Sequence, residues 1–480
     1  MLPRILSSSW LGICQLNFPD CDCACTLTPI SPATAPSAAA VLFPATAHLI
    51  AHHQTWRIYH NPLGPAAAVA LNPPAQALWQ TFTSPATLSQ ELLGDTDNYQ
   101  AVQSLIQAGM LRPTEQALLA ASHSTTLGAW LHVAGHCNLA CDYCYLADKK
   151  TETSLATLRA AIDATLRSAK ALTYQQVHLK YSGGEPLLQP RLLLSAHAYA
   201  QQQAVESGIN LDGVILSNGT LLTSAIAAQL REAGLDLMIS LDGLGRFHDS
   251  QRHYSDGRGS FADVSRAIAL AQAEGLNPLI SVTITERNAN GLADLVAWLL
   301  EKDLRFTFNL YRENDCTAAL ADLHSDDEKI IAGMLAAYQV IERNLPRYSL
   351  LGALADRANF TSPHLYTCSI GRDYLVFDAR GRVSRCQMDM ARPITLANDP
   401  DPLTTVRRAT DRQNPSVEDK TECQTCQWRY WCGGGCPLLA YRVTGSYAAR
   451  SPYCNTYKSI FPEVLRLEGL RMIKYADVDT

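Results

Sequence analysis

The chain has 480 residues, a formal net charge of −6 and 47% hydrophobic side chains. The acidic balance argues against a nucleic-acid partner held by bulk electrostatics. No apolar run reaches the roughly 20 residues of a membrane-spanning helix, and the first residues are too weakly patterned for a signal peptide. We therefore expect a cytoplasmic protein of about three domains, with no nucleic-acid and no membrane partner.

Fifteen cysteines stand out in this composition. In a large cytosolic chain, clustered cysteines indicate metal sites rather than disulfides. They are not scattered at random, because none occurs from Tyr145 to Asp315. In chain order they are Cys14, Cys21, Cys23 and Cys25; then Cys137, Cys141 and Cys144; then Cys316; then Cys368, Cys386, Cys423, Cys426, Cys432, Cys436 and Cys454.

The first part of the chain predicts a tail and a small domain. Residues 1–40 are rich in Ser, Pro, Ala and Cys, so we expect a disordered or poorly packed tail whose cysteines bind no metal. A start codon placed too early is an alternative. Residues 41–115 predict two strands, 55–61 and 66–72, and three helices, 73–82, 87–93 and 99–111. This set is typical of a winged-helix element, and a packing appendage is the alternative.

Residues 128–315 alternate strands with helices such as 154–172 and 262–275. Repeated βα units predict a parallel sheet with right-handed crossovers. Six strands make a partial (β/α)6 barrel of the α/β class, whose active site lies at the C-terminal strand ends. The expected strands are Trp130–Ala134, Val177–Ser182, Gly213–Ser217, Leu237–Leu241, Leu279–Thr285 and Arg305–Leu310.

Three further segments follow this predicted barrel. Residues 316–365 predict a helical bridge, with 326–345 as its clearest helix. Residues 366–456 are rich in cysteine and poor in regular patterns. Residues 463–476 have the apolar spacing of a terminal amphipathic helix, so 366–480 form a C-terminal cysteine-rich domain.

The first cysteine site has the spacing C-x3-C-x2-C at Cys137, Cys141 and Cys144, directly after the first predicted strand. Three thiolates can hold three irons of a [4Fe–4S] cluster, which leaves the fourth iron open to a small molecule. A structural zinc is the alternative, with His136 or a distant cysteine as the fourth ligand.

This loop, with Tyr143 as the aromatic residue before the last cysteine, resembles the signature of the radical S-adenosylmethionine (SAM) superfamily. The resemblance implies an enzyme whose cluster donates an electron to SAM, which then yields a 5′-deoxyadenosyl radical. That radical removes a hydrogen atom from the substrate. The cofactor supplies this chemistry, and the protein supplies placement and exclusion of solvent.

Other strand ends carry weaker signals of the same kind. Gly183, Gly184 and Glu185 resemble the GGEP motif of this family, which implies contacts to the SAM amino group; an ordinary turn is the alternative. By the same resemblance, Ser240 and Arg252 contact the SAM carboxylate, and Asn218 or Asp242 contacts the ribose or nearby groups. Turn and cap chemistry is the alternative for these polar residues.

The seven later cysteines resemble the SPASM domain of radical SAM maturases, which carries two auxiliary [4Fe–4S] clusters. The resemblance places Cys423, Cys426, Cys432 and Cys454 around one cluster, and Cys368, Cys386 and Cys436 around the other. The second set has three cysteines, so one iron is open to substrate, or Cys316 or a tail cysteine completes it. Cys316 as a buried apolar thiol is the favoured alternative, and two structural zincs are the alternative for the whole field.

Together these features predict three [4Fe–4S] clusters, SAM, and a radical SAM oxidoreductase that acts on a peptide or protein. The front domain, residues 41–115, looks similar to the winged-helix peptide-recognition elements of peptide-maturation systems. This resemblance favours a maturase of a ribosomally synthesised precursor peptide, which forms a crosslink or another oxidative modification. Such a domain would bind the leader as an added strand. The reductant would be a flavodoxin or ferredoxin. The rivals are an anaerobic sulfatase maturase that forms formylglycine, and a non-catalytic metal-binding scaffold.

Overall fold

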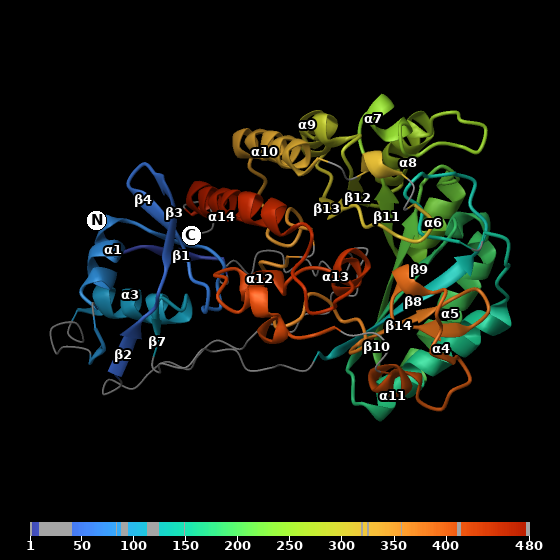
Figure 1. The fold of residues 1–480 in the computed structure, drawn as a ribbon, viewed down its shortest axis with the longest axis horizontal. Coiled ribbons are helices and arrows are strands. Elements are labelled where there is room, and N and C mark those ends of the chain that lie inside the picture. Colours follow the sequence, from blue (N-terminus) through green and yellow to red (C-terminus); the bar gives the residue numbers. More distant parts are fainter. Residues whose placement is uncertain are drawn as a thin grey trace.

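The computed structural model describes residues 2–8, 41–82, 84–87, 95–112, 124–147, 149–317, 320–323, 326–356, 358–409 and 414–476. Figure 1 shows three parts: a front domain with both chain ends, a large sheet with its helices, and a cysteine-rich segment between them. In the described residues, no helix has both the length and the apolar character needed to cross a membrane.

In its described residues, the front domain is built from short antiparallel strands and two helices. A four-stranded sheet has the order β1-β5-β4-β3, and a three-stranded sheet has the order β6-β2-β7. Asn72 begins the first helix because its side chain accepts a hydrogen bond from the Ala75 amide, and prolines fill the first turn. The elements are β1 (Ile5–Ser7), β2 (Val41–Pro44), β3 (His48–His53), β4 (Trp56–His60), β5 (Val69–Leu71), α1 (Pro73–Gln80), β6 (Ala86–Thr87), α3 (Thr96–Gln107) and β7 (Leu111–Arg112).

Several expectations for this region can be compared with the structure. Strands β4 and β5 and helices α1 and α3 are present where predicted. The expected helix at 87–93 lies almost wholly outside the described residues. The tail expectation is wrong for Ile5–Ser7, because β1 pairs with β5 and completes the sheet. Residues 9–40, with Cys14, Cys21, Cys23 and Cys25, lie outside the described residues, and the winged-helix assignment stays a prediction.

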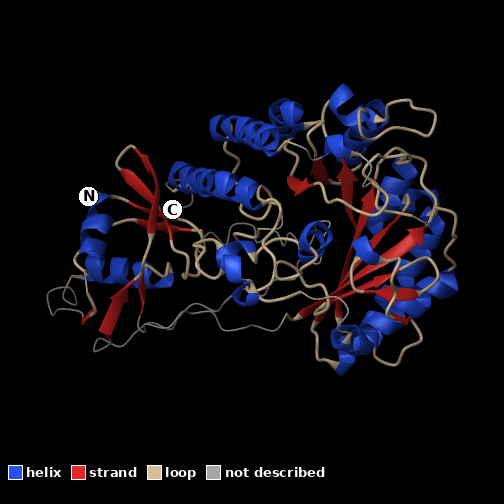
Figure 2. Ribbon diagram, viewed as in Figure 1, coloured by secondary structure: helices blue, strands red, loops and turns tan. Residues whose placement is uncertain are grey.

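The large sheet contains the six predicted strands, all parallel and in chain order (Figure 2). The strands are β8 (Thr126–Ala134), β9 (Gln176–Gly183), β10 (Asn210–Ser217), β11 (Asp236–Ser240), β12 (Leu279–Ile284) and β13 (Phe306–Leu310). The crossover helices are α4 (Leu155–Ala171), α5 (Pro190–Ser207), α6 (Ser224–Glu232), α7 (Arg246–Asp249), α8 (Phe261–Ala273) and α9 (Leu292–Glu301).

The sheet continues into the cysteine-rich region, which the sequence did not predict. Strand β14 (Tyr374–Phe377) pairs with β8 in parallel, and β15 (Arg382–Ser384) and β16 (Thr395–Leu396) extend the edge in antiparallel fashion. These pairings join the cysteine-rich region to the large sheet beside β8. Short 3₁₀ turns are η1 (Pro186–Leu188), η2 (Ala289–Gly291), η3 (Ala321–Leu323), η4 (Gln387–Asp389), η5 (Val417–Asp419) and η6 (Thr421–Cys423).

The last helix ties the front domain to the rest of the chain. Helix α14 (Cys454–Tyr475) packs against β3, β4 and β5 on one side and against α10 (Asp327–Arg343) on the other. The contact is tight at Gly469, where a Cβ atom would lie 2.5 Å from Ile58. The remaining helices are α11 (Pro402–Arg408), α12 (Arg429–Cys432) and α13 (Pro437–Thr444).

Candidate active site

The loop after β8 holds Cys137, Cys141 and Cys144, each partly exposed. The thiol of Cys137 accepts hydrogen bonds from the Leu139 amide (3.4 Å) and the Asn218 side chain (3.8 Å). Such donors are typical of cluster thiolates. Burial raises the pKa of Cys141 to about 12. Since iron binds the thiolate form, the metal itself has to favour deprotonation here.

The geometry of the cysteines bears on the zinc alternative. Within the described ranges, no three His, Cys, Asp or Glu side chains are placed to hold one metal ion. Thiolates on a single zinc stand roughly 4 Å apart. A cubane gives each thiolate its own iron and therefore spaces the thiolates more widely. Which of the two groups Cys137, Cys141 and Cys144 hold stays a prediction.

Gly183, the last residue of β9, and Gly184, which follows it, let this strand end lie against the cysteine loop. A Cβ atom on Gly184 would lie 2.0 Å from the His136 carbonyl oxygen, and one on Gly183 would lie 2.2 Å from that of Ala134. The Gly184 amide donates to the Ala134 carbonyl at 2.6 Å. Glycine is needed because the two backbones are in contact. This contact fixes the position of the cysteine loop relative to the end of β9.

Glu185 is fully buried and lies outside the cavity described below. Its carboxylate accepts hydrogen bonds from the Ser217 hydroxyl (2.7 Å), the Asn218 amide (2.7 Å) and the Leu187 amide (2.9 Å). Burial raises the pKa of this carboxyl group. In the structure Glu185 therefore joins the ends of β9 and β10, and its expected contact to SAM stays a prediction.

A second network surrounds Arg252. The guanidinium donates to the Tyr143 hydroxyl at 2.5 Å, and that hydroxyl donates to Asp242 at 2.6 Å. Burial raises the pKa of Tyr143 well above its usual value, so the phenol stays neutral. The Nε atom of Arg252 is buried and has no hydrogen-bond partner among the described residues. A free guanidinium donor suits the carboxylate of a bound ligand.

Asp242 is fully buried and holds the network in place. Its carboxylate also accepts from the Thr283 amide (2.8 Å) and the Gln251 side chain (2.9 Å). His248 accepts from the Asp242 amide, and burial lowers the pKa of this imidazole to about 3. Asp242 thus positions Tyr143 and does not reach the cavity.

A cavity of about 210 Å³ lies over the strand ends, between the cysteine loop and the cysteine-rich region. The predicted residues in its wall are Cys137, Cys141, Tyr143, Cys144, Gly183, Gly184, Asn218, Ser240 and Arg252. Thr283, in the wall as well, belongs to the segment 281–285, which by the resemblance to the radical SAM family flanks the adenine. The sequence missed several others in the wall: Trp130, Tyr145, Ser182, Asn309, Arg312, Gln387 and Met388. Strand-end position could have indicated Ser182 and Asn309, whereas Gln387 and Met388 arrive only through the β8–β14 pairing.

The charge of this cavity is distinctive. Its described wall contains two arginines, Arg252 and Arg312, and no Asp, Glu, His or Lys. Arg312 donates to both oxygens of the buried Asp356, at 2.7 and 2.8 Å, and Tyr457 donates to the same carboxylate at 2.6 Å. The wall therefore offers cationic and neutral groups but no carboxylate base.

The later cysteines separate into groups. Cys423, Cys426, Cys432 and Cys454 line one small cavity, as the SPASM resemblance implies. Burial raises the pKa of Cys432 to about 12. The grouping of Cys368, Cys386 and Cys436 stays a prediction. Cys316 is exposed, so the expectation of a buried apolar thiol is wrong; it lines a separate cavity.

Lys420 is a buried residue that the sequence analysis missed. It is fully buried, and its ammonium group donates to the carbonyls of Gly434 (3.3 Å) and Gly435 (3.5 Å). Burial lowers its pKa, and four cysteines oppose that shift: Cys423, Cys432, Cys436 and Cys368. The lysine thus carries its charge between the two predicted cysteine sets.

Comparisons with known proteins show what this chain is similar to. The Radical SAM superfamily profile matches residues 131–299. A serine-type anaerobic sulfatase-maturating enzyme of Bacteroides thetaiotaomicron is 25% identical over 69% of this chain and 87% of its own length. An uncharacterized protein of Methanocaldococcus jannaschii is 29% identical over 35% of this chain. The match spans only 57% of the length of that relative.

A solved structure has the same fold. Native anSMEcpe with bound AdoMet and Cp18Cys peptide matches 74% of this chain and 100% of its own, with a TM-score of 0.58 and 18% identity. At that identity the likeness concerns the fold alone. Residues 131–299 therefore form a radical SAM domain, for which a [4Fe–4S] cluster and SAM are the implied cofactors, and the cysteine-rich region that follows fits the SPASM type.

Proposed function

We propose that this chain is a radical SAM peptide maturase. It removes a hydrogen atom from a residue of a ribosomally synthesised precursor peptide and leaves a crosslink or another oxidative modification. When bound, the cluster and SAM would supply a 5′-deoxyadenosyl radical for that step. The observation that carries the proposal is a strand edge in the front domain.

That edge is β3. It pairs with β4 on one side and ends the order β1-β5-β4-β3, so its other side has no strand partner in the described sheet. Leu49 is 46% exposed on this strand. An unpaired edge is a template for an extended peptide, which adds backbone hydrogen bonds as a further strand. A leader peptide is the occupant we propose.

The protein's own residues have distinct tasks in this proposal. Cys137, Cys141 and Cys144 hold the first cluster. Ser240 and Arg252 bind the SAM carboxylate, with Arg252 oriented by the neutral phenol of Tyr143 at 2.5 Å. The aromatic rings in the cavity wall exclude water, which protects a reactive species.

The cysteine-rich region would hold two auxiliary clusters. We assign Cys423, Cys426, Cys432 and Cys454 to one and Cys368, Cys386 and Cys436 to the other. A shared cavity supports the first set. Electrons would come from a flavodoxin or ferredoxin.

The second candidate function is sulfatase maturation, and the Bacteroides relative favours it. Oxidising a serine or cysteine side chain to an aldehyde removes the proton of its hydroxyl or thiol group, which requires a base within hydrogen-bond reach. The cavity wall holds no carboxylate, histidine or lysine among its described residues. In addition, all of anSMEcpe aligns with 74% of this chain, so about a quarter of this chain has no counterpart there.

The chemistry is tested with reconstituted full-length protein. After dithionite reduction it should release 5′-deoxyadenosine from SAM and remove hydrogen from a short peptide encoded beside its gene. Tandem mass spectrometry would locate the new bond, and an aldehyde-specific hydrazide would not react with the product. Iron-free protein that binds only zinc and leaves SAM intact would disprove the proposal, and a hydrazide-reactive sulfatase peptide would establish the rival function.

The leader site is tested by hydrogen–deuterium exchange with and without the same precursor. Amides of β3 (His48–His53) should exchange more slowly when the precursor is bound. Strand β1 is the matched control, because it forms the opposite edge of the same sheet. Unchanged exchange at β3 in the presence of a peptide that becomes modified would place recognition elsewhere.

A further inference from the structure

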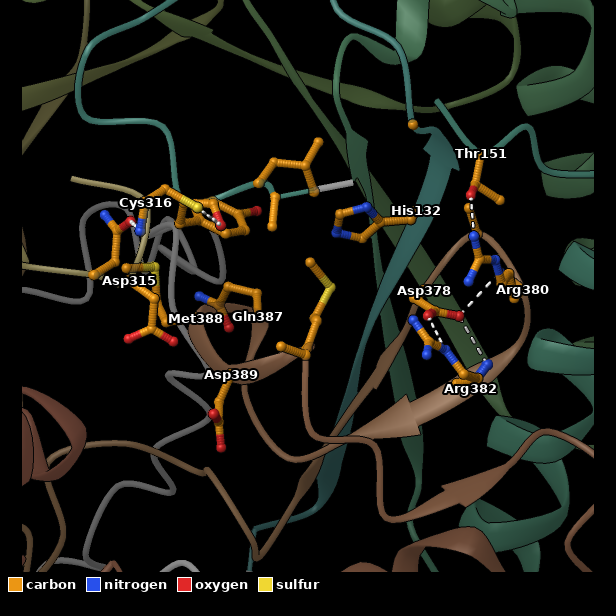
Figure 3. Close-up of a pocket in the computed structure, with 18 of the residues that line it drawn as sticks. His132, Thr151, Asp315, Cys316, Asp378, Arg380, Arg382, Gln387, Met388 and Asp389 are labelled. Carbon is orange, nitrogen blue, oxygen red and sulfur yellow. Dashed lines mark hydrogen bonds and ion pairs between the residues drawn. The ribbon is translucent and has the colours of Figure 1, made fainter. Parts of the chain in front are cut away.

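A second cavity of about 290 Å³ adjoins the first (Figure 3). The two cavities share Tyr145, Gln387 and Met388 in their walls. Its volume is at the lower limit of the roughly 300–1,000 Å³ typical of pockets for drug-sized ligands. It is therefore large enough for one or two amino-acid side chains and adjoins the cavity over the strand ends.

The charged groups in this second wall are largely engaged with one another. Asp378 accepts from Arg382 at 2.6 Å, and Arg380 donates to the Thr151 hydroxyl at 2.8 Å. Arg442 lies 3.7 Å from Asp315. A charged ligand group would have to compete with these partners. Between them lie the apolar side chains of Leu146, Met388 and Met390.

His132 is the exception among the polar groups of this wall. It is 2% exposed, and its Nε2 atom is buried without a hydrogen-bond partner in the part of the chain that the structure describes. Figure 3 shows its ring pointing into the cavity, toward the side where Cys316, Gln387 and Met388 lie. Burial lowers the pKa of this imidazole to about 4, so it is neutral at pH 7 and can donate or accept one hydrogen bond.

We propose that this second cavity receives a neighbouring side chain of the substrate peptide, and that His132 selects an uncharged hydrogen-bonding group on it. The ligand class is a neutral amide or hydroxyl carried on an apolar stem. Leu146 and the two methionines contact the stem, and Nε2 of His132 contacts the polar end. An apolar side chain of equal size leaves Nε2 unpaired, and a charged one has to compete for groups that already have partners. This inference rests on the proposed peptide substrate.

The test uses Cys316 as a reporter, because it is exposed and lines the same cavity. Reconstituted, SAM-loaded protein is treated with iodoacetamide, and alkylation of Cys316 is followed by peptide mapping. The probes are capped pentapeptides at millimolar concentration, with glycine at every position except the third. That position carries glutamine, leucine, glutamate or lysine.

The glutamine peptide should slow alkylation of Cys316 about threefold to tenfold more than the leucine peptide, as expected for one neutral hydrogen bond. The glutamate and lysine peptides should protect no better than the leucine peptide. His132→Phe should abolish the preference, and His132→Gln should restore part of it. Equal protection by glutamine and leucine, no protection by any peptide, or a preference that survives in His132→Phe would each overturn the inference.

His197→Phe is the matched control. His197 is equally buried, and burial lowers its pKa to about 4 as well, but it lies on α5 away from this wall. It should keep the glutamine preference. SAM cleavage without peptide is measured in parallel. A wild-type protein that releases no 5′-deoxyadenosine contradicts the proposed function alone, whereas normal cleavage without a glutamine preference contradicts this inference alone.

Discussion

The role of Lys420 depends on the residues that surround it in the fold. In the sequence it is an ordinary lysine three positions before Cys423. In the structure it is fully buried, and its charge interacts with cysteines of both predicted auxiliary sets. A buried cation favours the more negative, reduced state of a nearby cluster. The lysine is therefore expected to raise the reduction potentials of these clusters.

Replacing this cation tests the expectation. In reconstituted protein, Lys420→Met should lower the auxiliary potentials by on the order of tens of millivolts, because the substitution removes a buried positive charge that favours the reduced clusters. Redox titration followed by electron paramagnetic resonance measures the shift. Lys458→Met is the control, since Lys458 is exposed beside Cys454 and its charge is screened by solvent. Equal potentials in wild type and Lys420→Met would contradict this role.

At the scale of elements, the site depends on how closely β8 and β9 approach. Gly184 has an ordinary backbone conformation, yet a Cβ atom there would collide with the His136 carbonyl at 2.0 Å. Neither backbone can move without displacing the cysteine loop. The glycine is needed for space and not for conformational freedom.

Gly184→Ala should therefore reduce iron bound at the first site and abolish SAM cleavage, while the auxiliary clusters remain. Iron analysis and 5′-deoxyadenosine release measure the two effects. Gly208→Ala is the control that distinguishes a steric clash from a loss of backbone freedom. Gly208 has a φ of +67°, and a Cβ atom there would have no atom within 4 Å. It should cost about 1 kcal/mol of stability and leave iron and cleavage unchanged. Full activity in Gly184→Ala would show that the loop can shift without loss.

For the whole molecule, buried histidines link stability to pH. Burial lowers the pKa of five of them from 6.5 to about 3 or 4: His60, His132, His197, His248 and His364. Above about pH 6.5 both the folded and the unfolded chain carry these groups neutral. Below that value the unfolded chain binds protons that the folded chain does not, so stability falls as the pH falls from 6.5 toward 4.

His197→Gln removes one of these five titrating groups and so measures its contribution to the pH dependence of stability. The dependence of unfolding free energy on pH between 6 and 5 should become shallower by roughly 1.4 kcal/mol per unit. Urea unfolding at a series of pH values measures the slope, and loss of clusters in acid affects both proteins equally. His52→Gln, at an exposed position on β3, should leave the slope as in wild type. An unchanged slope in His197→Gln would mean that His197 titrates normally in the folded chain.

Much of the fold could be predicted because its signals are local. The six parallel strands and helices α4, α8 and α10 follow from hydrophobic periodicity within single segments. The cysteine spacing and the two glycines likewise indicate a cluster loop and a close backbone approach. These features depend on neighbours along the chain, so the sequence alone determined them.

Contacts between distant segments were decided only by the tertiary structure. The pairing of β14 with β8 brings Gln387 and Met388 to the cavity, although about 250 residues separate them from β8. The same non-local packing puts β1 in the front sheet, buries Glu185 and Lys420, exposes Cys316 and leaves Nε2 of His132 without a hydrogen-bond partner among the described residues. Neither periodicity nor spacing encodes such contacts, because each depends on which surfaces meet after the elements have formed.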